Sequence, residues 1–424
     1  MAAGTTTAFD VPAAARAVLE GNWRDGEYRG RHYAFSVPSP RSYPWQWYWD
    51  SCFHAIVRRR FDAPGARAEL ETLLTAMDPD GFIGHTVLWG HPLDWQRAIR
   101  YNIASRSDLM TSTIQPPILA WAWAWAVGDP AAEPRIARHH EWLREHRALE
   151  PDGLLWLIQP DESGMDASPK FDHVWGRLAQ GRMRFPLLIA RNRRLGFDAR
   201  RIAAAGRPVV CEVLTNVAWS LSEQALGRPS LTPALIERLY DPRRGRFADD
   251  VRHAVHPTAP ADRPVTWDTL APLALPDLPD AIAQRLVDEV LRAPRFADGV
   301  PLPAVAMDDP THTSRETWWG RHRHWRGPSW INSAWLVSLG LRRLGLDDEA
   351  DTLARRLTAV VAREGFREYY EARQGYGMGA HDFGWSTLLW ELVDPAVPPA
   401  PEPGAPAPGA PPPPSPPAQA SRDD

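Results

Sequence analysis

Residues 158 to 172 read IQPDESGMDASPKFD, a stretch in which acids stand among glycine, serine and proline. Gly164 and Pro169 interrupt both helical and strand periodicity, so the backbone is expected to turn here. An apolar segment that contains tryptophan precedes the turn. A carboxylate held beside aromatic side chains is partly desolvated, and desolvation raises the pKa of an acid. We interpret the stretch as a loop whose acids are suited to proton transfer.

The sequence on both sides of this loop is dominated by helical patterns. Leu70, Leu73, Leu74 and Met77, for example, fall on one face of a helix that a DPDG turn ends. Few segments suggest strands, so an all-α architecture is predicted. Helix pairs arranged as a closed toroid would collect the loops at one side, although spacing alone does not establish such a ring. Helices are predicted at about 10 to 19, 53 to 59, 64 to 77, 134 to 149, 209 to 226, 280 to 291, 331 to 344 and 348 to 361.

A further helix is predicted to begin at Pro116 and to include Trp121, Trp123 and Trp125. The alternation of these tryptophans with alanine also fits a strand. The helix is favoured because the separating residue is alanine and the run is long.

Length and composition point to one large domain. The chain has 424 residues, and we expect a folded domain over residues 1 to 393, followed by a disordered Pro/Ala-rich tail from 394 to 424. Two separate cysteines indicate neither a disulfide framework nor a zinc site. The first residues lack a basic flank followed by an apolar run, and nowhere does an apolar stretch approach the length of a membrane span. A cytoplasmic protein without a membrane partner is therefore predicted.

Positive and negative charges are nearly balanced, and their distribution argues against a nucleic-acid partner. The net charge is -4, and Lys170 is the only lysine beside many arginines. No basic stripe suggests a nucleic-acid surface. The histidines show no spacing typical of a metal site, so neither a metal nor a cofactor is predicted. A homo-oligomer remains possible.

Many of the 21 tryptophans cluster at 45 to 49, 121 to 125 and 318 to 330. Tryptophan is stiff, large and polar at one edge, which suits both core packing and sugar binding. Asp50 stands in the first cluster, where it or Ser51 fits the N-cap of the helix that follows. A carboxylate among indoles also suits sugar hydroxyls, and the two interpretations are compatible. His85 lies in an aperiodic stretch that we expect to cover a cleft.

The segment from Trp318 to Trp335 combines basic donors with aromatic faces. Arg321, Arg323 and Arg326 are candidates for forked hydrogen bonds to a carboxylate. The alternative is that two of the three are solvated or paired with local acids. An anion-binding segment is the prediction.

Six motifs in order resemble glycoside hydrolase family 63, and within it the bacterial glucosylglycerate and mannosylglycerate hydrolases. They cover roughly residues 40 to 392, and it is their order that is specific. They are WYWDSCF at 47 to 53, STIQPP at 112 to 117, ESGMDASP at 162 to 169, WRGPSW at 325 to 330, REYY at 367 to 370 and DFGWS at 382 to 386.

The resemblance implies an (α/α)6 barrel, a toroid of helix pairs with long loops over the cleft, and metal-independent hydrolysis with inversion. Asp166 matches the family's general acid and Glu368 its general base. Inversion needs the two carboxyl groups roughly 6.5 to 9.5 Å apart, which leaves room for the attacking water. For substrate binding the resemblance points to Tyr43, Trp47, Trp49, Asp50, Gln115, Trp325 and Trp330, to which we add His85 and Arg321.

The sequence departs from this family in one place, since His324 precedes WRGP where a tyrosine is usual. Asp161 and Glu162 are expected to be structural, one of them capping or pairing with Lys170 or a nearby arginine. The predicted substrate is glucosylglycerate or mannosylglycerate. The alternatives are a trehalase-like or oligosaccharide-trimming α-glucosidase and a carbohydrate-binding protein without activity.

Overall fold

The computed structural model describes residues 9 to 90, 109 to 177, 184 to 315, 317, 318, 321, 322 and 324 to 396, with only the backbone described between 317 and 322. Most of the predicted tail, from 397 onward, lies outside these residues. None of the described helices has the length and apolar character needed to cross a membrane.

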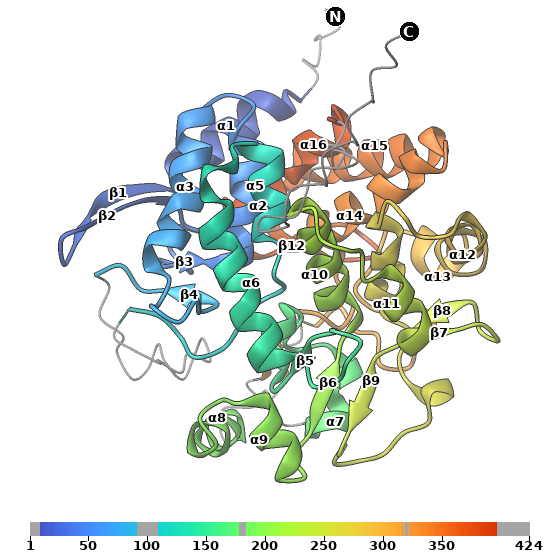
Figure 1. Ribbon diagram of the computed structural model, residues 1–424. Helices are drawn as coiled ribbons and strands as arrows, with labels where there is room; N and C mark the ends of the chain where they lie inside the picture. Colours follow the sequence, from blue (N-terminus) through green and yellow to red (C-terminus); the bar gives the residue numbers. More distant parts are fainter. Residues whose placement is uncertain are drawn as a thin grey trace, which may run out of the picture.

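Helices make up most of the regular structure (Figure 1). The predicted helices are present, including the tryptophan-rich one, so the choice of helix over strand there is confirmed. The α-helices are α1 (Val11–Gly21), α2 (Tyr48–Arg58), α3 (Ala63–Ala76), α5 (Leu119–Ala126), α6 (Glu133–Arg147), α7 (Asp172–Trp175), α8 (Arg184–Arg194), α9 (Ala199–Ala204), α10 (Val213–Ala225), α11 (Thr232–Leu239), α12 (Asp280–Leu286), α13 (Pro294–Ala297), α14 (Ile331–Arg343), α15 (Asp347–Glu364) and α16 (Leu389–Val393).

Short 3-10 segments and one π turn complete the helical elements. They are η1 (Pro130–Ala132), η2 (Pro160–Ser163), η3 (Pro169–Phe171), η4 (Pro260–Asp262), η5 (Trp267–Ala274), the π turn η6 (Val287–Leu291) and η7 (Gly384–Leu388).

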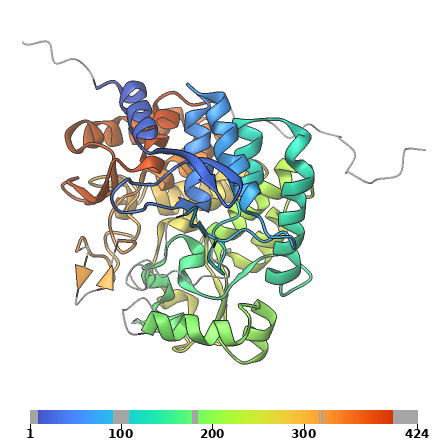
Figure 2. The same cartoon turned by 90° about the vertical axis from the view of Figure 1, so that its left-hand side faces the viewer.

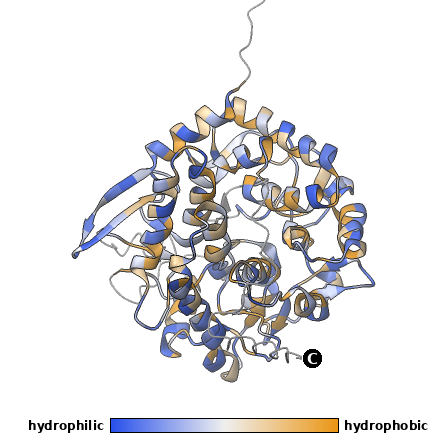
Figure 3. Ribbon diagram, turned by 45° about the horizontal axis from the view of Figure 1, so that its top comes forward, coloured by the Kyte–Doolittle hydropathy of each residue, from blue (hydrophilic) through white to orange (hydrophobic). Residues whose placement is uncertain are grey.

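Inner helical elements contact one another in sequence order. Element α2 packs against α5, α5 against α10, α10 against η5, η5 against α14, α14 against η7, and η7 against α2 again. Other helices lie outside them: α3 packs on α2, α6 on α5, α11 on α10, α12 on η5, α15 on α14, and α1 on η7. Figure 3 shows the helices following one another round the outline of the molecule.

The structure holds more strand than predicted. Every strand belongs to a small antiparallel sheet that sits in the loops between helices. The strands are β1 (Trp23–Tyr28), β2 (Arg31–Ser36), β3 (Gln46–Trp47), β4 (Thr86–Val87), β5 (Trp156–Leu157), β6 (Val209–Cys211), β7 (Tyr240–Asp241), β8 (Arg246–Phe247), β9 (Asp250–Arg252), β10 (Thr317–Trp318), β11 (Arg321–His322), β12 (Arg367–Tyr370) and β13 (Gly377–His381). The β1–β2 hairpin lies in front of the helices in Figure 2 and packs along α3 through β2.

Three predicted helix starts were wrong, one of them that of α5, which begins at Leu119 and not at Pro116. Val209–Cys211 forms β6, paired with β5 and β9, and α10 begins only after Glu212, whose carboxylate accepts a hydrogen bond from the Thr215 N–H at 2.6 Å. Helix α2 begins at Tyr48 with Trp47 as its N-cap, so neither Asp50 nor Ser51 caps it. The chain turns directly from β3 into α2, because β3 pairs with β4 just before the helix.

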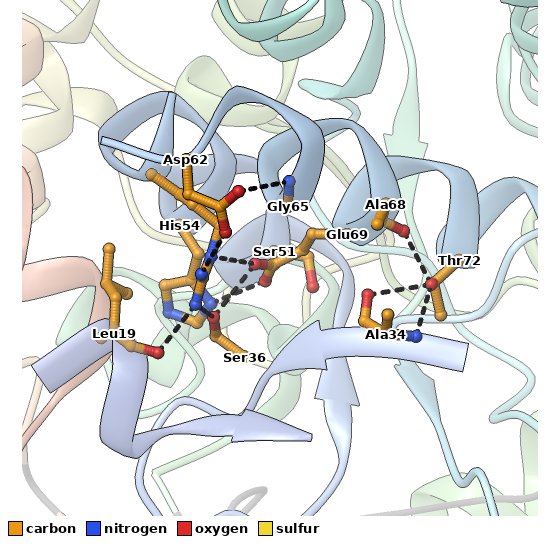
Figure 4. A network of polar contacts seen from close by, with 12 residues as sticks. Leu19, Ala34, Ser36, Ser51, His54, Asp62, Gly65, Ala68, Glu69 and Thr72 are labelled. Carbon is orange, nitrogen blue, oxygen red and sulfur yellow. Dashed lines mark hydrogen bonds and ion pairs between the residues drawn. The ribbon is translucent and has the colours of Figure 1, made fainter. Parts of the chain in front are cut away.

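A buried polar network fixes α2 against α3 (Figure 4). The Glu69 carboxylate contacts the His54 ring at 3.0 Å and accepts from the Ser36 hydroxyl at 3.1 Å. The Arg58 guanidinium donates to the Leu19 carbonyl at 2.8 Å and to Asp62 at 2.9 Å. Because Glu69, His54 and Arg58 are buried, each depends on its protein partners. The network therefore fixes α2 against α3 and the preceding segments through His54 and Arg58.

Candidate active site

A cavity of about 370 Å³ lies where the inner helical elements begin. Asp50 stands in the first turn of α2, Gln115 precedes α5, Trp330 is the N-cap of α14, and Trp385 lies in η7. The cavity is lined by residues including Tyr43, Trp47, Trp49, Asp50, His85, Gln115, Asp161, Asp166, His324, Trp325, Trp330, Glu368, Tyr369, Phe383 and Trp385. All predicted site residues whose side chains are described thus line one cavity.

Asp166 lies in the loop between η2 and η3, as predicted for this stretch. Gly164 has φ +72, and a Cβ there would meet the Trp49 ring at 2.5 Å. Only glycine tolerates both the left-handed backbone and this close approach. The Asp166 carboxylate then reaches the cavity, where its Oδ1 lies 2.9 Å from Nε2 of His324.

Glu162 is structural, and the expected pairing with a nearby arginine is confirmed. Its carboxylate accepts from the Arg147 guanidinium at 2.8 Å and from the backbone N–H groups of Ile114 and Ile158 at 3.2 and 2.8 Å. The side chains of Arg147 and Glu162 are both fully buried. This pair ties the acid-bearing loop to α6 and to the segment that carries Gln115.

Lys170 anchors the other end of the loop. Its ammonium contacts Glu212, Asp268 at 2.7 Å and Asp249 at 3.3 Å. Burial alone would lower the pKa of Lys170, but the charges of the three carboxylates raise it. Within the described residues these three acids form the one group close enough to hold a metal ion, and the lysine ammonium already lies among them.

Glu368 lies in β12 with two donors on its carboxylate. The Tyr43 hydroxyl donates to Oε1 at 2.9 Å, and the Ala380 N–H donates to Oε2 at 2.9 Å. Glu368 is 8% exposed. Burial raises its pKa, while the His324 charge and the two hydrogen bonds act in the opposite direction. A carboxylate held in this way stays basic enough to take a proton from water near neutral pH.

The glutamates that flank Glu368 stabilise the β12–β13 turn. Glu371 accepts from the Arg373 N–H at 2.8 Å, from the Gln374 N–H and from Ser314. Glu364 accepts from the Gly377 N–H at 3.0 Å. Neither of them lines the cavity.

Tyr43→Phe is expected to move the acidic limb of the pH–rate profile to higher pH, by about half a unit to one unit. The hydroxyl donates to the ionised Glu368 and lowers its pKa, so its removal raises that pKa, and the base is ionised only at higher pH. The measurement is kcat/KM from pH 3 to 8. Tyr33→Phe, outside the cavity, serves as the control, and an unmoved limb in Tyr43→Phe would exclude Glu368 as the group that titrates there.

Aromatic rings form one wall of the cavity. Trp325 and Trp330 stack with their centroids 3.8 Å apart and their planes 3° apart, and Tyr369 lies 4.6 Å from Trp330. Trp49 and Trp385 meet edge to face at 5.2 Å. Ser329 and Tyr370 exchange backbone hydrogen bonds, which fixes the WRGPSW segment beside the strand that carries Glu368. Such a rigid apolar wall suits the face of a sugar ring.

Several polar side chains that line the cavity have a defined protonation or hydrogen-bonding state. Burial lowers the pKa of His85 to about 3, so its ring is neutral, and its Nδ1 lies 2.5 Å from the Thr113 hydroxyl. The Gln115 amide oxygen accepts from the Trp49 N–H at 3.1 Å. Burial, reinforced by the Glu368 charge, raises the pKa of Asp50 well above its usual value. These residues offer hydrogen-bonding groups to sugar hydroxyls.

Sequence reasoning missed several lining residues. Asp161 was expected to be structural, but it lines the cavity, with its carboxylate oxygens 2.9 and 3.0 Å from the Gln159 amide nitrogen. Burial raises its pKa well above the usual value. Tyr369 and Trp385 lie within quoted motifs, so their motifs were the available signal.

The predicted anion-binding segment is only partly described. Arg326 forks onto the Asp172 carboxylate at 2.9 and 2.5 Å and does not line the cavity, which confirms local pairing for this arginine. The side chains of Arg321 and Arg323 lie outside the described residues. Of the described side chains in the segment, His324, Trp325 and Trp330 line the cavity.

Comparison with known proteins places this geometry in context. The family model described as "Mannosylglycerate hydrolase MGH1-like glycoside hydrolase domain" matches residues 43 to 229 and 227 to 386. A mannosylglycerate hydrolase from Thermus thermophilus is 29% identical over 84% of this chain and 95% of its own length. A glucosylglycerate hydrolase from Mycolicibacterium hassiacum is 25% identical over 83% of this chain and 92% of its own. The crystal structure of a GH63 mannosylglycerate hydrolase from Thermus thermophilus in complex with glucose superposes with a TM-score of 0.72 at 27% identity, covering 91% of this chain and all of that one.

Proposed function

The chain belongs to the mannosylglycerate hydrolase MGH1-like glycoside hydrolase family, and we propose on this basis that it cleaves the α-glycosidic bond of glucosylglycerate or mannosylglycerate. The products would be hexose and glycerate. The predicted resemblance to this group of glycoside hydrolases is confirmed by the family model. The observation that carries the proposal is that Asp166 and Glu368, from distant parts of the sequence, line the same aromatic-walled cavity.

The proposed reaction inverts the configuration at the anomeric carbon. Asp166 protonates the glycosidic oxygen as the bond to the anomeric carbon breaks. Glu368 takes a proton from the water that attacks the opposite face of the sugar. The two groups differ in their surroundings, because Glu368 is held by two hydrogen-bond donors whereas Asp166 contacts an imidazole. A separation of roughly 6.5 to 9.5 Å between the two carboxyl groups stays our prediction.

We infer that the helix-rich fold is an (α/α)6 barrel. The order of contacts among α2, α5, α10, η5, α14 and η7, each with an outer helix, supports this arrangement. In such a barrel the segments before the inner helices meet at one end, which is where the cavity lies. The resemblance to the GH63 crystal structure is consistent with it.

The proposed leaving group is glycerate, and its carboxylate requires a cationic or multiply donating pocket. Arg321, which precedes the cavity-lining His324 by three positions in the sequence, is the proposed partner. A cavity of about 370 Å³ lies within the usual range for small-molecule sites. The trehalase-like and non-catalytic alternatives are not favoured, since the curated relatives described above are named as hydrolases of glycerate glycosides.

A substrate panel tests this proposal. We expect kcat/KM for glucosylglycerate or mannosylglycerate to exceed that for trehalose and kojibiose by at least about 100-fold, because a site built to pair a carboxylate discriminates strongly against substrates that lack it. The first anomer released from an α-glycoside, followed by proton NMR, should be β. Activity confined to the neutral disaccharides would refute the glycerate assignment, and initial release of the α-anomer would refute inversion.

A further inference from the structure

His324 contacts the proposed general acid directly. Its Nε2 lies 2.9 Å from Asp166 Oδ1, with the two side chains 16% and 24% exposed. The imidazole lies between two aromatic rings: it stacks on Tyr369 with centroids 6.0 Å apart and meets Trp330 edge to face at 6.1 Å. The His324 backbone is held as well, because its carbonyl accepts a hydrogen bond from the Trp330 indole at 3.3 Å. The contact is therefore built into the cavity wall.

Among the described side chains, the charged groups that line the cavity with this pair are mainly acids. A positive charge on His324 lowers the pKa of Glu368, and the next residue in β12, Tyr369, carries the stacked ring. Arg326, two residues along the chain, is paired with Asp172. Among the described side chains, the other titratable groups that line the cavity are Tyr43, Asp50, His85 and Asp161. Of these, His85 stays neutral because it is buried.

An isolated aspartate is mostly ionised near neutral pH, because its ordinary pKa is about 3.9, and it then has no proton to donate as a general acid. An imidazole next to it changes this, since a coupled pair loses its shared proton with an apparent pKa that belongs to both groups. With an ordinary histidine pKa of about 6.5, raised by a neighbouring carboxylate, such a pair keeps its proton to higher pH than the carboxylate alone.

We propose that His324 and Asp166 hold one proton between them, and that His324 is the positioning residue that keeps Asp166 supplied with the proton it donates. This inference rests on the proposed hydrolysis. During cleavage the proton passes from Asp166 to the glycosidic oxygen, and a second proton passes from the attacking water to Glu368. Asp166 is left ionised beside a neutral imidazole. The imidazole then takes a proton from solvent and shares it with Asp166, while Glu368 returns its proton to solvent, so the enzyme regains its starting protonation state.

His324→Gln tests this role, because glutamine keeps an amide donor near the Nε2 position but cannot titrate. We expect the alkaline limb of kcat/KM to move at least one pH unit lower, because the amide stabilises ionised Asp166 and no longer shares its proton. His256→Asn, at an exposed loop position, is the control and should leave the limb in place. A purely structural role of His324 would lower kcat/KM at every pH without moving the limb, and that result would overturn the proposal.

A second measurement does not depend on turnover. The imidazole signals of His324 are assigned by their loss in His324→Gln and titrated by NMR in the wild-type protein and in Asp166→Asn. We expect the His324 midpoint to fall by at least one pH unit in Asp166→Asn, and an unchanged midpoint would refute proton sharing. If the wild-type protein releases no hexose from any glycoside of the panel, the proposed hydrolysis fails, while the NMR titration still decides whether the pair shares a proton.

Discussion

Asp166→Asn and Glu368→Gln are each expected to lower kcat by about 10² to 10⁴-fold on a glycerate glycoside, which is the usual contribution of a general acid or base. The amide of Asp166→Asn cannot protonate the leaving oxygen, and the amide of Glu368→Gln cannot accept a proton from water. Both replacements keep the shape of the side chain, so folding should be retained. The measurement is steady-state kinetics at the optimum pH, together with thermal unfolding of each variant.

The two roles separate when the leaving group changes. Fluoride leaves an α-glycosyl fluoride without being protonated, so Asp166→Asn should recover most of its rate on this substrate. Glu368→Gln should stay slow, because the water is still not activated. Glu364→Gln is the matched control: Glu364 is a neighbouring glutamate that accepts a backbone hydrogen bond in the β12–β13 turn and does not line the cavity. Near-normal turnover of the glycerate glycoside by either catalytic variant would remove that residue from the mechanism.

Lys170→Met is expected to lower the free energy of unfolding by about 3 to 5 kcal/mol at neutral pH, because removing one partner of a buried ion cluster leaves uncompensated charges. Glu212, Asp249 and Asp268 would then face one another without a cation. The loop that carries Asp166 would lose its anchor, so activity should fall as well. The measurement is urea denaturation followed by tryptophan fluorescence.

The effect of Lys170→Met should depend on pH in a defined direction. Burial raises the pKa of Asp249 to about 7, although the Lys170 charge lowers it, and removing the lysine raises it further. The variant's carboxylates can therefore take up protons as the pH falls, which relieves their repulsion, so the loss of stability should be largest above pH 7 and smaller at pH 5. Arg177→Met is the surface control, since the Arg177 side chain is 79% exposed and lies 3.9 Å from its acid. An equally small effect of both substitutions would show that the buried cluster contributes nothing.

The periodicity of apolar residues predicts where helices occur, but it does not predict the residues at which they begin. Amphipathic spacing located α3, α14 and α15 to within a few residues because packing and pattern agree there. Val209–Cys211 was assigned to the helix that follows, because a short apolar run fits a helix as well as a buried strand. Pairing with β5 and β9, which are distant in sequence, decides the matter, and no local pattern contains that information.

The site shows the same limit. Composition alone gave no reason to prefer Glu368 to Glu364 or Glu371, and the ordered motifs made the choice. The structure supplies the physical difference, since the two flanking glutamates satisfy backbone donors of a turn while Glu368 reaches the cavity. Asp161 is predicted to be structural from the sequence but lines the cavity. Its exposure to the cavity depends on the path of the η2 turn, which a single sequence does not specify.

The buried ammonium of Lys170 has a practical consequence. Because it is the only lysine in the sequence and lies among three carboxylates, a reagent that acylates lysine amines has a single side-chain target, which is shielded in the folded protein. A lysine-specific protease likewise has one site to cut, four residues after the proposed catalytic acid. The chain thus contains an internal chemical reporter, and the rate at which that single amine reacts records how often the loop holding Asp166 opens to solvent.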